Sequence, residues 1–337
     1  MNEFYNKMQY FEDTEGIPAE IYYHYTTLDA LYNIVSNRTF WLTSLKSSND
    51  KKEFYYKATD FLKEFSGLCG IEQNSEAKEY FQLIKESIRI HEKEFYNTFK
   101  EKVVPYALCL CEKKDNLTHW DRYAGGCTGV CIGFNLSALK IHMQRMNSTV
   151  FGMGLYDVEK IFYTEEPRTM YIRSRILFLL NQVRKNMKSE DFVELIREHG
   201  HVYAASVCSQ LMKFSKNNSF IDEDEVRLYH DSAAIKESFR LMELIETNIE
   251  AELYKNIKKN LQELIKQWHL EEEKFYLSGH GIRGYKELCL EEVWGSGVVP
   301  EIILGPMCLQ NKSELRRFLK ANGLEGTKIT DSKVPIR

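Results

Sequence analysis

Glycine and proline are scarce in this sequence, which has 18 glycines and 6 prolines among its 337 residues. With 43% hydrophobic and 28% charged residues, the composition is typical of a globular chain with a substantial core. No apolar run approaches the roughly 18 residues of a transmembrane helix, so we expect no membrane contact. The first residues lack the basic and apolar segments of a secretory signal, which predicts a cytoplasmic protein.

The 8 cysteines show no metal-binding pattern. Cys109 and Cys111 fall on one face of a predicted strand, and Cys127 and Cys131 are four residues apart, so neither pair has Cys-x-x-Cys spacing. In a reducing compartment such residues are buried free thiols. We therefore predict no metal. The net charge of −4 also argues against a protein that coats nucleic acid.

Strong catalytic motifs are missing as well. The sequence has no GxxxxGK[ST] phosphate loop, no GxGxxG after a strand, no GxSxG nucleophile elbow and no HExxH zinc helix. P-loop phosphoryl transfer, serine-hydrolase chemistry and zincin chemistry are therefore not expected.

Hydrophobic periodicity predicts short strands separated by helical blocks. The predicted strands are 21–25, 39–44, 105–111, 129–134, 160–164, 226–230, 285–290 and 301–304. The predicted helices are 28–35, 50–65, 75–102, 136–146, 168–187, 190–214, 232–277 and 312–321. This order indicates an α+β fold in which a small mixed or antiparallel sheet is wrapped by helical insertions.

We expect residues 1–17 to form a polar lead-in and residues 18–337 to form one domain, with helical insertions at about 50–102, 136–214 and 232–277. The last insertion has no glycine or proline, and its apolar residues recur every four positions, which predicts a long helix or a helical hairpin. This helical region either packs on the body of the protein or forms a homodimer.

The first candidate for a functional centre is the segment His24-Tyr25-Thr26. His24 ends a predicted strand directly before a helix N-terminus, which favours anionic groups. A ring N–H at this place can meet a ligand hydroxyl. The alternative is a core histidine bonded to a backbone carbonyl.

The second candidate is the acidic segment Glu223-Asp224-Glu225, directly before the predicted strand 226–230. In extended geometry Glu223 and Glu225 project to the same side and can act as a pair, while Asp224 points away. Adjacent carboxylates repel one another, so burial should raise the pKa of at least one. The alternative is a solvated acidic turn.

Two further segments carry side chains suited to a nucleotide. Trp120 and Tyr123 are three residues apart beside a glycine pair and can stack on a planar ring, while Arg122 can meet a phosphate. A hydrophobic anchor under a loop explains the aromatic residues equally well. Thr43 and Ser44 end the predicted strand 39–44 and supply hydroxyl groups.

Several segments, in order, resemble a bacterial family of unknown function. They are HYTTLDALYNIV, FWLTSLKSSNDKKEF, LCLCEKKDNLTHWDRYAGG, FIDEDEVRLY, EIILGP and SKVPIR. The resemblance extends from about residue 20 to the C-terminus and makes 232–277 an insertion.

A strand ending in histidine, a later aromatic residue and a Glu-x-Glu directly before a strand are similar to the ADP-ribosyltransferase superfamily. This resemblance implies an ADP-ribosyltransferase-like sheet with NAD as the substrate. It implies that His24 holds the NAD ribose, with Thr26 as the small polar residue after it. Tyr123, with Trp120 as its rival, would stack on nicotinamide.

The same resemblance assigns the acidic residues. Glu225 matches the glutamate that stabilises the ribosyl-cation-like transition state, and Glu223 matches the partner that activates the acceptor. Thr43 and Ser44 match hydroxyls of the arginine-modifying branch. The chain departs from the pattern at Tyr25, where the superfamily has glycine after the histidine.

The resulting hypothesis is an enzyme that transfers ADP-ribose from NAD or hydrolyses NAD, acting as a toxin or phage-defence effector. The acceptor would be a protein side chain or a nucleic-acid base. The first alternative is a non-catalytic sensor that binds a nucleotide or a protein in the same cleft, with the region 232–277 as its partner surface. A metal-dependent nuclease built on the acidic segment is a third interpretation.

Overall fold

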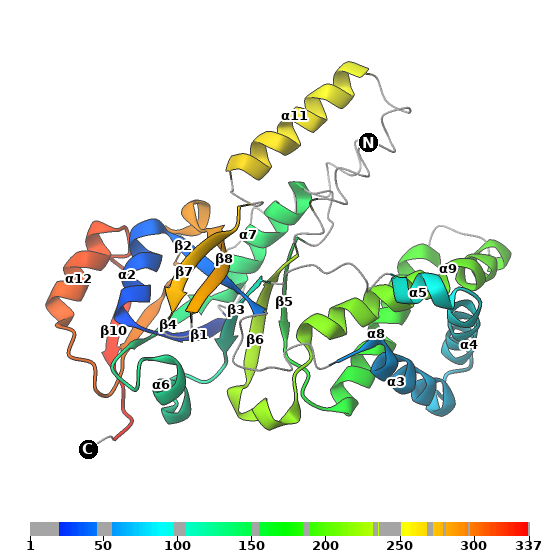
Figure 1. The fold of residues 1–337 in the computed structure, drawn as a ribbon, viewed down its shortest axis with the longest axis horizontal. Helices are drawn as coiled ribbons and strands as arrows, with labels where there is room; N and C mark the ends of the chain where they lie inside the picture. Colours follow the sequence, from blue (N-terminus) through cyan, green and yellow to red (C-terminus); the bar gives the residue numbers. More distant parts are fainter. Residues whose placement is uncertain are drawn as a thin grey trace. The chain divides into compact units, whose positions relative to one another are not determined.

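The computed structural model describes residues 20–45, 56–97, 106–149, 155–184, 189–231, 235, 251–267, 272–278, 281–295 and 297–335. Its fold is α+β, as predicted (Figure 1). The strands are β1 (Ile21–Thr26), β2 (Thr39–Ser44), β3 (Tyr106–Cys111), β4 (Val130–Asn135), β5 (Tyr156–Lys160), β6 (Glu225–His230), β7 (Lys274–Ser278), β8 (Gly281–Cys289), β9 (Glu301–Leu304) and β10 (Lys328–Asp331). The α-helices are α2 (Leu28–Asn37), α3 (Ala58–Ile71), α4 (Ser75–Ile90), α5 (Glu92–Asn97), α6 (Leu117–Tyr123), α7 (Leu136–Thr149), α8 (Glu165–Arg184), α9 (Ser189–Phe214), α11 (Ala251–Gln267) and α12 (Lys312–Ala321). Short 3-10 turns are η3 (Asn218–Glu223) and η5 (Glu291–Val293).

The chain divides into two compact units. The sheet unit comprises 1–47, 104–159 and 223–337, and the helical unit comprises 48–103 and 160–222. The predicted insertion at 50–102 therefore falls in the helical unit. The predicted insertion at 136–214 is divided, because α7 and nearly all of β5 belong to the sheet unit.

In the described residues, the sheet unit holds one ten-stranded mixed sheet with the order β10-β9-β4-β1-β3-β2-β8-β7, with β6 beside β3 and β5 beside β6. It is larger than the small sheet that the sequence indicated. Strand β3 pairs with β6 along its whole length on one edge. On its other edge β3 pairs with β2 at Tyr106 and Ala107 but with β1 at Cys111. Strands β1 and β2 therefore diverge along β3, and we call this divergence the fork.

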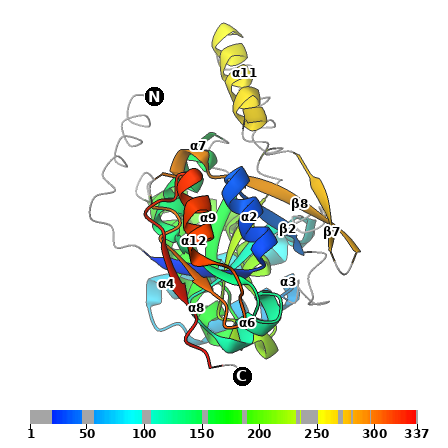
Figure 2. The same cartoon turned by 90° about the vertical axis from the view of Figure 1, so that its left-hand side faces the viewer.

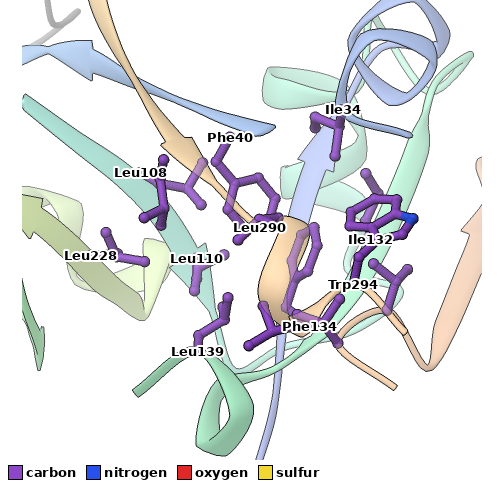
Figure 3. Close-up of a cluster of buried hydrophobic side chains, with 14 of the residues drawn as sticks. Ile34, Phe40, Leu108, Leu110, Ile132, Phe134, Leu139, Leu228, Leu290 and Trp294 are labelled. Carbon is purple, nitrogen blue, oxygen red and sulfur yellow. The ribbon is translucent and has the colours of Figure 1, made fainter. Parts of the chain in front are cut away.

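The main core covers one face of the sheet. Alternate residues of the strands supply it, among them Phe40, Leu108 and Phe134, which are at most 5% exposed (Figure 3). The rings of Phe40 and Phe134 meet edge to face with centroids 4.4 Å apart, a geometry that aromatic pairs prefer. Helices α2 and α12 lie side by side (Figure 2), where the rings of Tyr32 and Phe318 stack at 5.4 Å.

A smaller core covers the opposite face. It contains Tyr23 and Tyr25 from β1, Cys131 from β4, and Trp120 and Ala124 from the α6 segment. Helix α6 begins at Asn116, whose side-chain oxygen accepts from the backbone N–H groups of the first turn, a favourable N-cap. This small core therefore fixes α6 beneath the ends of β1 and β4.

The helical unit has a core of its own, built from α3, α4, α8 and α9. A buried ion pair crosses it, since Arg168 donates from Nε and Nη2 to Glu64 Oε1 at 2.9 and 2.7 Å. The Tyr56 hydroxyl donates to the other oxygen of Glu64 at 2.8 Å. The carboxylate thus has partners on both oxygens, which a buried charge requires.

Several predicted elements differ from the structure. The segment 117–123 is a helix rather than a polar turn, and strand β5 lies at Tyr156–Lys160 rather than at 160–164. The long helix predicted at 232–277 is wrong at its end, because Lys274–Ser278 forms β7 and pairs with β8. Strand β10 was not predicted; it adds in parallel to β9.

Part of the predicted helical region 232–277 and the whole lead-in 1–17 lie outside the described residues, as does the capping pattern at Asp50. In α11, Leu261 and Ile265 are buried in the main core of the chain itself. The dimer through this region stays a prediction. No helix in the described residues is long and apolar enough to cross a membrane.

Candidate functional site

The strand register places the side chains of His24 and Glu225 on opposite faces of the sheet. Tyr23 pairs with Cys111, and Cys111 pairs with Glu225, so these three side chains share the face of the smaller core. His24 is the next residue along β1 and pairs with Ile132 of the main core. Two strand spacings separate the backbones by about 10 Å, but successive side chains alternate in direction. The resemblance implies that His24 and Glu225 act on the same NAD molecule, and this strand register contradicts that implication.

His24 lies in the fork between β1 and β2. Its Nδ1 is 3.0 Å from the Cys109 carbonyl oxygen, which can only accept, so Nδ1 carries the proton. Burial lowers the pKa of His24, against a smaller raising effect of this bond, so the ring is neutral near pH 7. Its Nε2 is then an acceptor. A ligand hydroxyl would donate to His24, the reverse of the polarity expected from the sequence.

Glu225 is buried and bound to a cation. Arg227 Nε donates to Glu225 Oε1 at 2.9 Å, and the side chains are only 1% and 4% exposed. The two residues are two apart in β6 and therefore project to the same face. A carboxylate in this pair has its charge already balanced, which weakens its attraction for a developing cation.

Glu223, by contrast, is partly exposed and joins α6. The hydroxyl of Tyr123 donates to Glu223 Oε1 at 2.6 Å. Nε2 of His119 donates to the Glu223 backbone carbonyl at 3.0 Å. The structure therefore unites two segments about 100 residues apart. We call Tyr123, His119 and Glu223 the α6–Glu223 cluster.

His119 is the buried member of this cluster. Its Nδ1 is 3.1 Å from Asn116 Oδ1, so both ring nitrogens face oxygen atoms. Burial lowers the pKa of His119, and the bond to the Glu223 carbonyl opposes this shift. The Tyr25 ring lies against His119, with centroids 5.1 Å apart. His119 thus connects β1 to the acidic segment.

The two predicted stacking residues differ in access. Trp120 is fully buried, meets Tyr25 edge to face and donates from its indole N–H to Asp115 at 2.9 Å, so it serves as the hydrophobic anchor. Tyr123 is 38% exposed, and Arg122 beside it is exposed as well. Of the two rings, only that of Tyr123 is accessible to a ligand.

A residue with a left-handed backbone conformation, Asp224, separates Glu223 from Glu225. Asp224 has φ of 45°, which breaks the alternation that would place Glu223 and Glu225 on one side. Its carboxylate lies 3.9 Å from Lys113 Nζ. The predicted pairing of the glutamates therefore fails on local backbone geometry, and Asp224 has a charged neighbour of its own.

The remaining predicted residues lie elsewhere. Thr26 is buried at the end of β1. Thr43 pairs with Ala107 and is 3.5 Å through Oγ1 from its carbonyl oxygen, while Ser44 is buried opposite Tyr106. Ala107 is about 13 Å along β3 from the strand end that faces Glu225, so the Thr43 and Ser44 hydroxyls do not join the α6–Glu223 cluster.

The sequence is similar to one family of unknown function. A family model described as "Protein of unknown function (DUF2971)" matches residues 119–228. This supports an uncharacterised family over that span. The match begins at His119 and ends within β6, so it includes every member of the α6–Glu223 cluster. No curated protein and no solved structure matches the chain.

Two residues of the site had no role assigned from the sequence. His119 fell in a segment predicted as a turn, and Lys113 precedes it in the same stretch. The signal that could have found the helix is Asn116, a residue favoured at N-caps, followed by the aromatic pair at spacing three.

Proposed function

We propose that the chain cleaves the nicotinamide–ribose bond of NAD, transferring ADP-ribose to an acceptor or to water, with Glu223 as the reacting carboxylate. The observation that carries the proposal is the Tyr123–Glu223 hydrogen bond of 2.6 Å, which holds a partly exposed carboxylate beside an accessible aromatic ring. The NAD substrate itself is drawn from the resemblance to ADP-ribosyltransferases.

Cleavage of the nicotinamide–ribose bond requires mainly a carboxylate placed close to the ribose. As the C–N bond breaks, its electron pair leaves with nicotinamide and the ribose becomes oxocarbenium-like. A carboxylate stabilises this cation, and water or an acceptor then adds to it and loses a proton. Glu223 is suited to this role because the Tyr123 hydroxyl fixes the position of its partly exposed carboxylate.

The neighbouring groups suit the rest of a dinucleotide. The exposed ring of Tyr123 offers a stacking surface for a flat base. Arg122 directly precedes Tyr123 on the same helix and is exposed, and Lys113 Nζ lies 3.9 Å from the Asp224 carboxylate, so both side chains can offer a cation to phosphate oxygens. The proposal leaves His24 outside the reacting centre, since it lies on the other face of the sheet.

The test is nicotinamide release from labelled NAD by the purified chain, with and without protein and nucleic-acid acceptors. We expect release by the wild type, a loss of at least about 100-fold in Glu223→Gln, and no change in Asp222→Asn. Asp222 is the matched control because it is an exposed neighbouring carboxylate outside the cluster. No release and no binding of NAD by the wild type would overturn the proposal.

A second function is favoured by one specific observation. The Arg227–Glu225 pair neutralises the residue that the resemblance makes catalytic. That arrangement suits a non-catalytic protein that binds a nucleotide at the α6–Glu223 cluster. Saturable NAD binding without nicotinamide release, weakened equally by Tyr123→Ala and Glu223→Gln, would select this function. A toxin or phage-defence role belongs to the proposal that the chain consumes NAD, and infection or toxicity assays test it.

A further inference from the structure

Two histidines and a glutamate converge within the helical unit, and none of them belongs to the α6–Glu223 cluster. His91 is the C-cap of α4, Glu94 lies on α5, and His201 lies on α9. His91 Nδ1 is 2.7 Å and His201 Nε2 is 3.8 Å from the same oxygen of Glu94, Oε2. One ligand atom from each of the three residues lies within 4.8 Å of the other two.

His201, the most buried of these three residues, is fixed by hydrogen bonds to Ser87. His201 is 8% exposed, and its Nδ1 is 3.2 Å from the Ser87 hydroxyl oxygen. The same hydroxyl accepts from the His201 backbone N–H at 3.1 Å. The Ser87 hydroxyl therefore occupies Nδ1, and Nε2 faces Glu94. Histidines that bind metals are oriented in this way by their second nitrogen.

The two imidazole rings are also mutually aligned. The rings of His91 and His201 stack with centroids 4.5 Å apart and an angle of 21° between their planes. Because the Ser87 hydroxyl lies at Nδ1, Nε2 is the nitrogen of His201 that faces Glu94. A neutral imidazole is the form that binds a metal.

We propose that His91, Glu94 and His201 form a binding site for one divalent transition-metal ion of the zinc class. Two imidazoles and one carboxylate are ligands that Zn²⁺ accepts, whereas Mg²⁺ and Ca²⁺ prefer oxygen atoms alone. Tetrahedral coordination at about 2.0–2.1 Å places ligand atoms about 3.3 Å apart, so side-chain rotations of about 1.5 Å close the site. The fourth position is left to water.

The metal site is independent of the NAD proposal. Its ligands come from the C-cap of α4 and from helices α5 and α9, so a bound ion clamps the α4–α5 junction to α9 and stabilises the helical unit. The sequence predicted no metal because His91 and His201 are 110 positions apart, and no short spacing motif joins them. Only the packing of α9 against α4 creates the ligand set.

The experiment is titration of the metal-stripped full chain with Zn²⁺ alone, followed by calorimetry and thermal unfolding. We expect one site per chain and, at about 100-fold excess over Kd, a rise of about 5 °C or more in the helical transition. The variants His91→Gln and Glu94→Gln should each lose at least 10-fold in affinity. Each removes a partly or fully exposed side chain, so both should fold.

The matched control is His199→Gln, an exposed histidine two positions before His201 on the same helix. It should bind Zn²⁺ as the wild type does, and Mg²⁺ should not compete in any protein. Absence of Zn²⁺ binding by the wild type overturns the proposal. So does an affinity that falls with His199→Gln but is unchanged in both His91→Gln and Glu94→Gln.

Discussion

Replacing Glu225 with glutamine tests whether this residue is structural or reacts. The Glu225 and Arg227 side chains are 4% and 1% exposed, and they are joined at 2.9 Å. Removing one partner of a buried pair costs about 3–5 kcal/mol because the other charge stays buried. Glutamine keeps an oxygen that can accept from Arg227, so we expect the lower value, about 3 kcal/mol. At a urea m-value of about 2 kcal/mol/M, the unfolding midpoint falls by about 1.5 M.

Tryptophan fluorescence is the appropriate assay, because all four tryptophans belong to the sheet unit. The double variant Glu225→Gln with Arg227→Met should recover part of the lost stability, since it removes the uncompensated charge. Glu223→Gln, at a partly exposed position, should lower the unfolding free energy by about 1 kcal/mol or less. A Glu225→Gln midpoint equal to that of the wild type would refute the buried-pair reasoning.

Three further outcomes follow from buried groups. Burial lowers the pKa of His230 to about 3, so this ring stays neutral in the folded state at pH values where it takes up a proton in the unfolded state. The free energy of unfolding is then at its full value above about pH 6.5 and falls by about 2 kcal/mol between pH 6.5 and 5. Urea titrations across that range should show a smaller loss in His230→Phe. Gly129→Ala would put a Cβ 2.2 Å from the Thr26 carbonyl oxygen, so the backbone must move, and we expect more than about 3 kcal/mol of destabilisation by fluorescence. Glu64→Gln removes the negative charge that balances the buried Arg168, and circular dichroism should show the helical transition destabilised by about 3 kcal/mol; an unchanged transition would contradict that role.

The sequence predicted elements best where the pattern was local. Alternation placed 39–44 as β2 and 226–230 as most of β6, and the helix stop at Asn322 lies at the end of α12. Helix α6 was missed because seven residues carry too little periodicity, although Asn116 marked its start. Strand β7 was predicted as the end of a helix, because apolar residues in a run without glycine or proline fit both the period of a helix and the period of a strand.

The candidate site was harder to predict because it depends on the register between strands and on the sign of one backbone φ angle. Nothing near His24 in the sequence reveals that Tyr23, rather than His24, is in line with Cys111 and Glu225. A single residue of offset moves a side chain to the other face of a sheet. The positive φ of Asp224 likewise separates the two neighbouring glutamates, so that Glu223 is partly exposed while Glu225 is buried. Both features are set by packing between distant segments.

The most direct test of the central claim compares nicotinamide release from NAD by Glu223→Gln and Glu225→Gln, with each rate divided by the fraction of folded protein. The account predicts that Glu223→Gln loses at least about 100-fold, while folded Glu225→Gln stays within a few-fold of the wild type. Loss of release in folded Glu225→Gln, with Glu223→Gln fully active, would contradict it.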